Sequence, residues 1–220
     1  SNHGYNILVE SGTGKGASIS DLDFTEAGAE IVHSKERVFS ADIILKIAAL
    51  KEEELKFLRP DQVLISPLHI PKLSAKFLDT LKQKRVIALA MDYIKDRNGF
   101  FPIVRMMSEM AGIGAIHIAS ELLSTANNGK GILLGGITGV EPSKVVIIGA
   151  GVVAEYATKA ALGLGAEVRI FDNKIYKLKR LQTNLGIRVY TSTINAPSFQ
   201  KEILDADVVI GAMHSKSGRS

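Results

Sequence analysis

The feature that most constrains this chain is a glycine-rich turn between a predicted strand and a predicted helix. Residues 144–148 form a continuous apolar run, and the sequence GAGVVA follows it directly over 149–154. Residues 152–164 then have the pattern of a helix that ends at Gly165. In this strand–turn–helix context, the pattern G-x-G-x-x-[G/A] is typical of dinucleotide-binding folds.

The glycines and the alanine of this turn have distinct physical roles. Gly149 permits a tight turn, and Gly151 has no Cβ, so a pyrophosphate can approach the backbone there. Ala154 lets the helix pack closely against the strand. The helix N-terminus offers free N–H groups and the positive end of its dipole to the phosphates. The turn therefore predicts a dinucleotide site, and the alternative is a glycine-rich turn in some other α/β sheet.

An acidic residue at the end of the next strand completes the pattern. Asp172 follows the predicted strand 167–171 and lies 18 residues after Ala154. A spacing of about 20 is typical of the carboxylate that accepts hydrogen bonds from the adenosine ribose. Its charge would repel a 2′-phosphate, so we expect NAD rather than NADP as the cofactor. FAD-binding folds share the glycine pattern, but no other part of this chain supports FAD.

Strand and helix patterns alternate along the rest of the chain. Strands are predicted over 5–10, 29–32, 43–47, 63–66, 85–91, 188–191 and 207–212. Helices are predicted over 21–28, 51–58, 73–84, 106–125, 175–185 and 199–204. The runs 43–47 and 85–91 have the apolar composition of buried strands. Such alternation is typical of parallel sheets.

We therefore expect the α/β fold class, with two Rossmann-like, doubly wound parallel-sheet domains. Residues 1–105 would form an N-terminal catalytic domain that holds the substrate, and residues 106–128 a long connecting helix. Residues 129–220 would form the NAD-binding domain. The chain starts in mid-pattern and ends just after a strand, so we expect both domains to be incomplete.

Composition and charge exclude several other classes of protein. The 220 residues include no cysteine, which excludes thiolate metal sites, and no two of the five histidines have metal-ligand spacing. No apolar run reaches the ~18 residues of a membrane span, and no signal segment is visible. The net charge of +4 is too small and too dispersed to indicate nucleic acid binding. We expect a cytoplasmic protein that binds no metal, membrane or nucleic acid.

A basic cluster follows Asp172 and consists of Lys174, Lys177, Lys179 and Arg180. We interpret most of these side chains as a solvated helix face. Lys177 lies about one and a half helical turns beyond Asp172 and is close enough in sequence to reach the ribose. As a nucleic acid surface the cluster is poor, because it is short and has one interleaved aromatic residue.

Two further positions lie where strands end. His69 follows the predicted strand 63–66 and is bracketed by Pro67 and Pro71, which would hold its imidazole at the rim of a sheet. Such a histidine can exchange protons near neutral pH, and a structural or surface role is the alternative. Met213 and His214 follow the strand 207–212, where ligands bind in open parallel sheets. Whether His214 faces a cofactor or water stays open.

Three segments together resemble the alanine dehydrogenase/pyridine-nucleotide transhydrogenase α-subunit family. They are RMMSEMAG at 105–112, GKGILLGGITGVEP at 129–142, and LRPDQVL at 58–64 with the following Leu68-His69. The resemblance implies two Rossmann-like domains and the NAD-dependent interconversion of L-alanine with pyruvate and ammonia. It also implies a small-molecule substrate, an amino acid or 2-oxo acid, and a homo-oligomer, either a dimer or a hexamer.

The resemblance implies roles for individual residues. His69 matches the catalytic histidine, and Ser108 matches a serine that contacts the cofactor phosphate. The other matches to cofactor contacts are Val152 and Val153 after the glycines, Asp172 and Lys177 at the adenosine ribose, and Met213 and His214 on the nicotinamide side.

One departure from the family pattern leaves the substrate open. Alanine dehydrogenases carry a Lys-Val-Lys-Glu-Pro stretch, whose second lysine binds the substrate, and Ala48 stands at that position here. Lys46 points to the same face about 7 Å away, but we interpret it as a packed strand residue. Three functions therefore remain: an amino-acid dehydrogenase, the NAD-binding component of a membrane transhydrogenase, which also lacks that lysine, and an NAD-binding relative without alanine activity.

Overall fold

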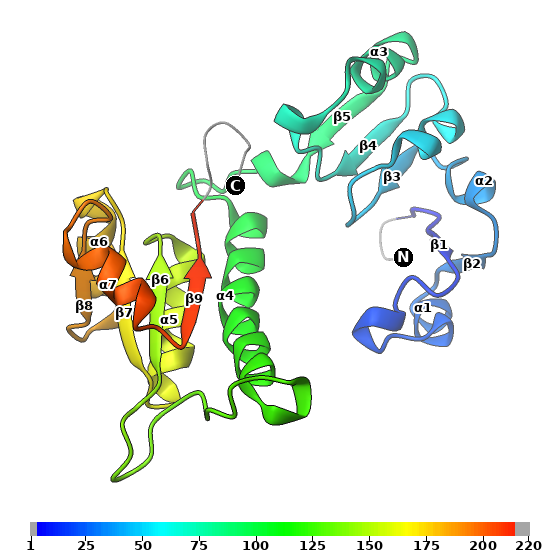
Figure 1. Ribbon diagram of the computed structural model, residues 1–220. Coiled ribbons are helices and arrows are strands. Elements are labelled where there is room, and N and C mark those ends of the chain that lie inside the picture. The colour runs from blue at the N-terminus through cyan, green and yellow to red at the C-terminus, as the bar shows by residue number, and fades with distance from the viewer. Residues whose placement is uncertain (1–3, 214–220) are drawn as a thin grey trace. The chain divides into compact units, whose positions relative to one another are not determined.

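The computed structural model describes residues 4–213, which form two compact units that divide between Phe101 and Pro102. Every strand pair in the described residues is parallel, and helices connect successive strands (Figure 1). The predicted α/β class is therefore confirmed. The long helix expected over 106–125 starts earlier, at Pro102, because proline is well tolerated in the first turn of a helix.

The first unit begins with a small two-stranded sheet. Strands β1 (Leu8–Glu10) and β2 (Glu30–Val32) pair in parallel, and η1 (Lys15–Ala17) and α1 (Asp21–Glu26) connect them. Helix α1 starts where the sequence predicts. The Ser20 side chain accepts a hydrogen bond from Asp23 N–H, and the Asp23 carboxylate accepts one from Ser20 N–H.

A three-stranded sheet follows, in the order β3 (Ile43–Leu45), β4 (Val63–Ser66) and β5 (Ile87–Ala90). The other elements of this region are α2 (Lys35–Val38), η2 (Glu52–Phe57), η3 (Ile70–Lys72), α3 (Ala75–Gln83) and η4 (Met91–Tyr93). One face of the sheet, with Ile44 and Leu64, packs against Phe77 and Leu81 of α3. The predicted helix over 51–58 is 3-10 rather than α.

Residues 43–47 and 85–91 contain strands, as predicted, but the prediction that these strands are buried is wrong. Successive residues of a strand point to opposite faces, and only one face carries the core. Ile43, Leu45 and Ile87 are 54%, 67% and 58% exposed, whereas Ile44 between them is buried. β3 and β5 are also the two edges of the sheet, so neither has a strand on its outer side within the described residues.

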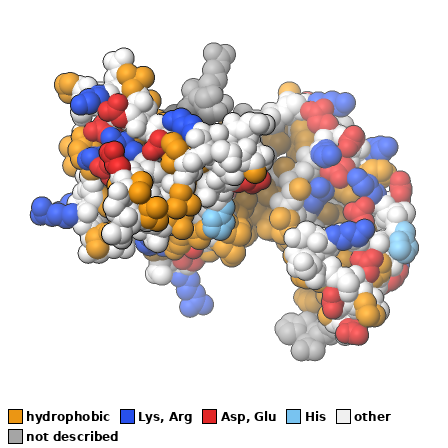
Figure 2. All heavy atoms as spheres, turned by 60° about the horizontal axis from the view of Figure 1, so that its bottom comes forward, with side chains coloured by type: hydrophobic (Ala, Val, Ile, Leu, Met, Phe, Trp, Pro, Cys, Tyr) orange, Lys and Arg blue, Asp and Glu red, His pale blue; other side chains and the backbone are white. Residues whose placement is uncertain are grey.

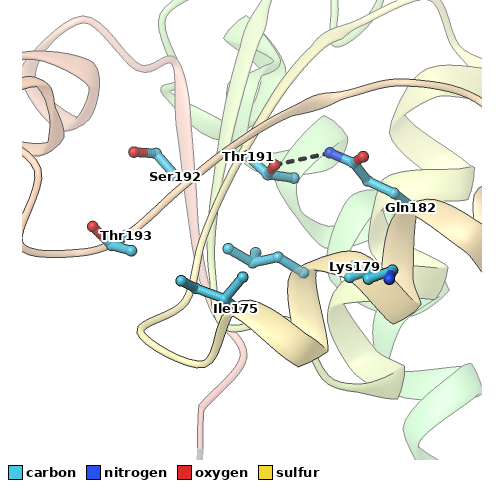
Figure 3. Close-up of a pocket in the computed structure, with 7 residues that line it drawn as sticks. Ile175, Lys179, Gln182, Thr191, Ser192 and Thr193 are labelled. Atoms are coloured by element: carbon cyan, nitrogen blue, oxygen red, sulfur yellow. Dashed lines mark hydrogen bonds between the residues drawn. The ribbon is translucent and has the colours of Figure 1, made fainter.

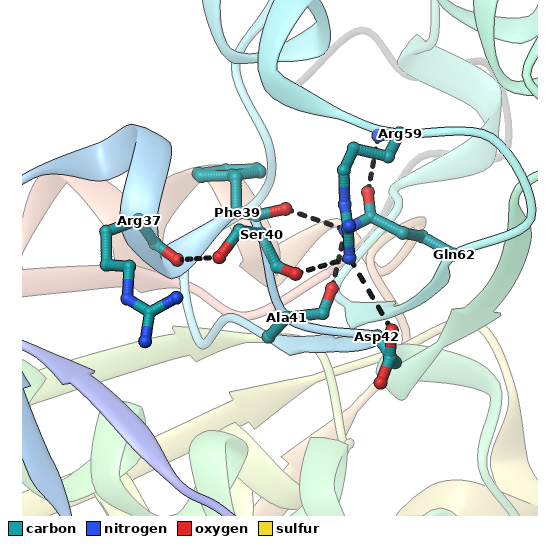
Figure 4. A network of polar contacts seen from close by, with 7 residues as sticks. All are labelled: Arg37, Phe39, Ser40, Ala41, Asp42, Arg59 and Gln62. Atoms are coloured by element: carbon teal, nitrogen blue, oxygen red, sulfur yellow. Dashed lines mark hydrogen bonds and ion pairs between the residues drawn. The ribbon is translucent and has the colours of Figure 1, made fainter.

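A buried glutamine joins the start of β4 to the segment before β3 (Figure 4). Gln62 Nε2 donates hydrogen bonds to the carbonyl oxygens of Phe39 at 2.7 Å and Ala41 at 2.6 Å. Gln62 Oε1 accepts a hydrogen bond from Arg59 N–H at 2.6 Å. Gln62 is only 2% exposed, so its amide needs partners inside the protein, and these three bonds supply them. They tie the segment before β3 to the segment before β4.

The second unit contains α4 (Pro102–Leu123), η5 (Thr125–Asn127), β6 (Lys144–Ile148), α5 (Val152–Gly163), β7 (Glu167–Phe171), α6 (Ile175–Leu185), β8 (Tyr190–Ser192), α7 (Ser198–Leu204) and β9 (Val208–Gly211). Its sheet has the order β8-β7-β6-β9. The strand order reverses at β6, so β6 and β9 flank a topological switch point. In open α/β sheets, ligands bind at the carboxyl ends of the strands at such a point.

Helices cover both faces of this sheet (Figure 1). Val145 and Ile147 of β6 pack on one face with Ala154 and Ala157 of α5. On the other face, Phe171 of β7 meets Phe199 of α7, with ring centroids 5.0 Å apart. This arrangement is the doubly wound layering that the sequence predicts.

Helices α4 and α5 touch backbone to backbone at one glycine. A Cβ on Gly112 would lie 2.4 Å from the carbonyl oxygen of Val153 and 2.9 Å from Ala157 N. Gly114, two residues further along α4, has open space at the same position. Gly112 therefore sets how closely α4 approaches the start of α5.

Within residues 4–213, none of the helices combines the length and apolar character that crossing a bilayer requires.

Replacing Gly112 with alanine should push α4 away from α5. We expect Gly112→Ala to lower the free energy of unfolding by about 1–3 kcal/mol, since overpacking a close contact costs that much. The matched control, Gly114→Ala in the same helix, should be neutral or stabilise by up to about 1 kcal/mol. Urea unfolding followed by circular dichroism measures both. Equal effects of the two substitutions would contradict the close contact.

Candidate functional site

The glycine turn lies at the switch point of the second unit. Gly149 has φ +117°, a conformation that favours glycine, and a Cβ there would lie 2.5 Å from the carbonyl oxygen of Ala212. Ala212 N–H donates to Ile148 O at 2.7 Å, and Gly149 N–H donates to Phe171 O at 2.6 Å. The turn is therefore wedged between the ends of β9 and β7, and only glycine fits at 149.

Among residues 4–213, the next glycine leaves the start of α5 open. Gly151 is the N-cap of α5, and nothing lies within 4 Å of the position that a Cβ would take. No side chain caps the helix, and the first N–H groups of any α-helix lack acceptors inside it. This open helix start, which includes Val152 and Val153, is the shape and the donor set that a diphosphate requires.

Asp172 occupies the end of β7, as predicted, but its carboxylate serves the backbone. Oδ2 accepts a hydrogen bond from Ala150 N–H at 2.9 Å, and Oδ1 accepts one from Lys174 N–H at 2.7 Å. The residue is only 5% exposed. Asp172 therefore ties the turn after β6 to the turn after β7, a role that the sequence pattern did not reveal. Each oxygen retains a further lone pair.

Of the remaining predicted cofactor residues, Met213 is the one that the structure brings to this turn. Ser108 lies one helical turn before Gly112 in α4, and its hydroxyl donates to Val104 O at 2.8 Å. Met213 is half exposed, and its side chain lies 2.8 Å from the Cβ position of Gly149. Lys177 makes no ion pair within residues 4–213. His214 lies outside the described residues.

In the first unit, His69 lies beyond the carboxyl end of β4 at the rim of its sheet. Its backbone is left-handed, with φ +47° and ψ +49°, which costs a residue with a Cβ about 1 kcal/mol. Its imidazole is 58% exposed, and Nδ1 lies 4.0 Å from Oδ2 of Asp92. Asp92 also accepts a hydrogen bond from Leu68 N–H at 3.1 Å. The carboxylate of Asp92, which the sequence analysis missed, therefore holds this loop beside the histidine.

Lys46 follows the carboxyl end of β3, at the same edge of the sheet. Its Nζ lies 3.5 Å from Oε2 of Glu54, and Nζ of Lys35 lies 3.6 Å from Oε1. Glu54 is 4% exposed. Burial alone would raise the pKa of Glu54, but the hydrogen bond from Lys51 N–H and the ammonium groups of Lys46 and Lys35 lower it below its ordinary value of 4.5. Lys46 is thus engaged in an internal ion pair, whereas Ala48 is exposed.

A separate pocket of about 400 Å³ lies between α6 and β8 (Figure 3). Its lining combines hydroxyl, amide, ammonium and apolar groups from Ile175, Leu178, Lys179, Gln182, Thr191, Ser192 and Thr193. Gln182 Nε2 donates to Thr191 Oγ1 at 2.8 Å across it. None of the predicted site residues lines this pocket, which lies at the outer edge of β8 rather than at the switch point.

On the face that Figure 2 shows, lysine and arginine side chains alternate with aspartate and glutamate. Within residues 4–213, no three histidine, aspartate or glutamate side chains group as metal ligands.

Family models match almost the whole chain. The alanine dehydrogenase/PNT N-terminal domain matches residues 1–111, and the alanine dehydrogenase/PNT C-terminal domain matches residues 115–219. The chain belongs to the alanine dehydrogenase/pyridine-nucleotide transhydrogenase family. The resemblance that the sequence segments indicated is therefore confirmed.

Individual relatives agree with this assignment. Alanine dehydrogenase of Staphylococcus epidermidis is 37% identical over 210 residues, which are 96% of this chain and 56% of that protein. Alanine dehydrogenase 2 of Staphylococcus aureus is 36% identical over the same length. A solved L-alanine dehydrogenase matches with a TM-score of 0.84 and 32% identity. The match covers 94% of this chain and 57% of that protein's chain. The chain thus spans about half the length of the curated relatives it matches.

A more distant solved structure shares the fold. A transhydrogenase from Sinorhizobium meliloti matches with a TM-score of 0.79 at 23% identity. The match covers 98% of this chain and 62% of that protein's chain.

The ion pair of Lys46 with Glu54 predicts a pH-dependent stability. A carboxylate with a lowered folded pKa stabilises the fold above about pH 4.5, and this contribution is lost as the pH falls through the lower folded value. We expect Glu54→Gln to cost about 2 kcal/mol at pH 7, and the difference from wild type to shrink below pH 4.5.

The control is Glu53→Gln, because the Glu53 side chain is 71% exposed and lies 3.9 Å from Lys51. It should change stability by less than about 0.5 kcal/mol. Thermal unfolding between pH 3 and pH 7 measures both variants. A Glu54→Gln variant as stable as wild type at pH 7 would contradict the internal pairing of Lys46.

Proposed function

We propose that this chain is part of an NAD-dependent, alanine dehydrogenase-like oxidoreductase that converts L-alanine reversibly to pyruvate and ammonia. The observation that supports this most is the turn at 149–151, where Gly149 is sterically obligatory and Gly151 leaves the start of α5 open. The relatives named alanine dehydrogenase supply the substrate class. The predicted homo-oligomer and cytoplasmic location stay predictions.

The residues around the turn fit a dinucleotide. The N–H groups of Val152 and Val153 would bind the diphosphate, and Ser108 would add a hydroxyl from α4. Asp172 would use its remaining lone pairs for the adenosine ribose, with Lys177 beside it. Met213 and His214 would lie on the nicotinamide side. When bound, the nicotinamide supplies hydride transfer, and the protein orients it.

His69 would move the proton in this reaction. Oxidation of an amino acid to an imine, followed by hydrolysis, requires groups that take up and return protons near neutral pH, and imidazole does this. The exposed ring and the neighbouring Asp92 carboxylate support this role. Asp92 would fix the loop that bears the imidazole.

A second candidate is an NAD-dependent relative that acts on another substrate. Ala48 replaces the family lysine, and Lys46 is engaged by Glu54, so neither residue offers a free ammonium group for the substrate carboxylate. The family models include the transhydrogenase component, but the curated relatives described above are named alanine dehydrogenase and the solved transhydrogenase is only 23% identical, so we favour the dehydrogenase. NADH oxidation with ammonium and a panel of 2-oxo acids separates the first two candidates.

The proposed cofactor site predicts a preference for NAD over NADP. The carboxylate of Asp172 should repel a 2′-phosphate, so we expect NAD to bind at least tenfold more tightly. Isothermal titration of the complete protein with each nucleotide measures the ratio. Equal affinities would show that Asp172, buried and bonded to the backbone, does not select the sugar.

The proposed proton transfer predicts a specific loss in the complete protein. We expect His69→Ala to lower kcat/KM for alanine by about 10²–10⁴-fold, the usual contribution of a general acid–base, and to leave NADH affinity unchanged. The control is His33→Ala, which removes an exposed histidine of the same unit and should keep full activity. Normal turnover by His69→Ala would overturn the assignment.

A further inference from the structure

The peptide groups on both sides of Ala150 are held by side chains of opposite charge. Asp172 Oδ2 accepts the Ala150 N–H, as described above. On the other side, Arg180 Nη2 of α6 donates to the Ala150 carbonyl oxygen at 3.2 Å. Ala150 itself is completely buried. A single residue of the turn is therefore clamped through both of its backbone polar groups.

This clamp determines where the next amide points. The Ala150 carbonyl and the Gly151 N–H belong to the same planar trans peptide, so they point in opposite directions. By holding the carbonyl, Arg180 fixes the direction of the Gly151 N–H, the first amide of the open helix start. Gly151 has no side chain that could restrict its backbone, so the constraint must come from outside the turn.

A second polar side chain on the same face of α6 contacts the first turn of α5. Asn184, four residues further on and thus on the same face, donates from Nδ2 to Oε2 of Glu155 at 2.8 Å. Glu155 is only 4% exposed, and its Oε1 accepts a hydrogen bond from Lys159 Nζ at 2.8 Å. Asn184 therefore anchors α6 to α5, whereas Arg180 reaches past the helix to the turn itself.

We infer that Arg180 is a positioning residue for the dinucleotide, which acts by fixing the Ala150–Gly151 peptide so that the Gly151 N–H faces the diphosphate. This inference rests on the proposed function of the turn. Arg180 is exposed, as expected for this helix face, and its guanidinium in addition reaches the turn. Arg180 serves diphosphate ligands in general, whatever substrate the complete protein oxidises.

The test compares affinities for NADH and ADP-ribose by isothermal titration, using the complete protein. We expect Arg180→Ala to weaken both ligands on the order of tenfold, the effect of losing one hydrogen bond from a charged donor. Arg180→Lys should weaken them less, because a lysine still places a donor and a positive charge near the carbonyl.

Two controls separate positioning from other effects. Lys179→Ala removes a positive charge from the position of α6 that precedes Arg180, and it should change the affinity for either ligand less than twofold. Asn184→Ala removes the other anchor between α6 and α5 and should lower the unfolding temperature without a comparable loss of affinity. If Arg180→Ala does not fold, Arg180→Lys replaces it, and its loss of affinity should still exceed that of Asn184→Ala.

The outcomes are distinct. Wild-type affinity in the Arg180 variants overturns the inference and leaves the proposed function intact. Equal losses in the Arg180 and Asn184 variants also overturn it, because Arg180 would then act only by docking the helix. Absence of NADH binding by the wild-type protein overturns the proposed function, and this inference with it.

Discussion

The structure of the second unit depends on a backbone contact at the end of its central strand. Gly149 brings the turn after β6 against the carbonyl of Ala212 at the end of β9, closer than any side chain would permit. This contact fixes the turn at the place where the strand order reverses. The open start of α5 follows directly, because the helix begins only three residues later. Asp172 and Arg180 then hold the intervening peptide groups from the neighbouring elements.

The sequence predicted most of the second unit because its signals are local. The apolar run 144–148 and the acidic residue after β7 each lie at an element boundary, and β6, β7 and α6 have the predicted bounds. The use of Asp172 could not be predicted in this way. Its two partners, the N–H groups of Ala150 and Lys174, become neighbours only when the sheet forms, and a spacing rule does not describe backbone hydrogen bonds.

The first unit shows where composition misleads. The runs 43–47 and 85–91 are apolar enough for buried strands, yet alternate side chains are exposed. Composition reports how apolar a strand is, but the number of covered faces depends on what packs on the sheet. The ion pair of Lys46 could not be predicted from the sequence either. Its partner Glu54 lies in η2, which is a 3-10 helix and not the α-helix that the sequence predicted. His69 and Asp92 likewise meet only through the parallel pairing of β4 with β5.

The glycine at the crossing of α4 and α5 has a mechanical consequence. Where two helices touch through flexible side chains, one can slide or tilt while the other stays in place. At Gly112 the backbones themselves are in contact, with no side chain between them to yield. Because α4 meets α5 through its backbone at Gly112, a shift of α4 would carry the first turns of α5 with it inside the second unit.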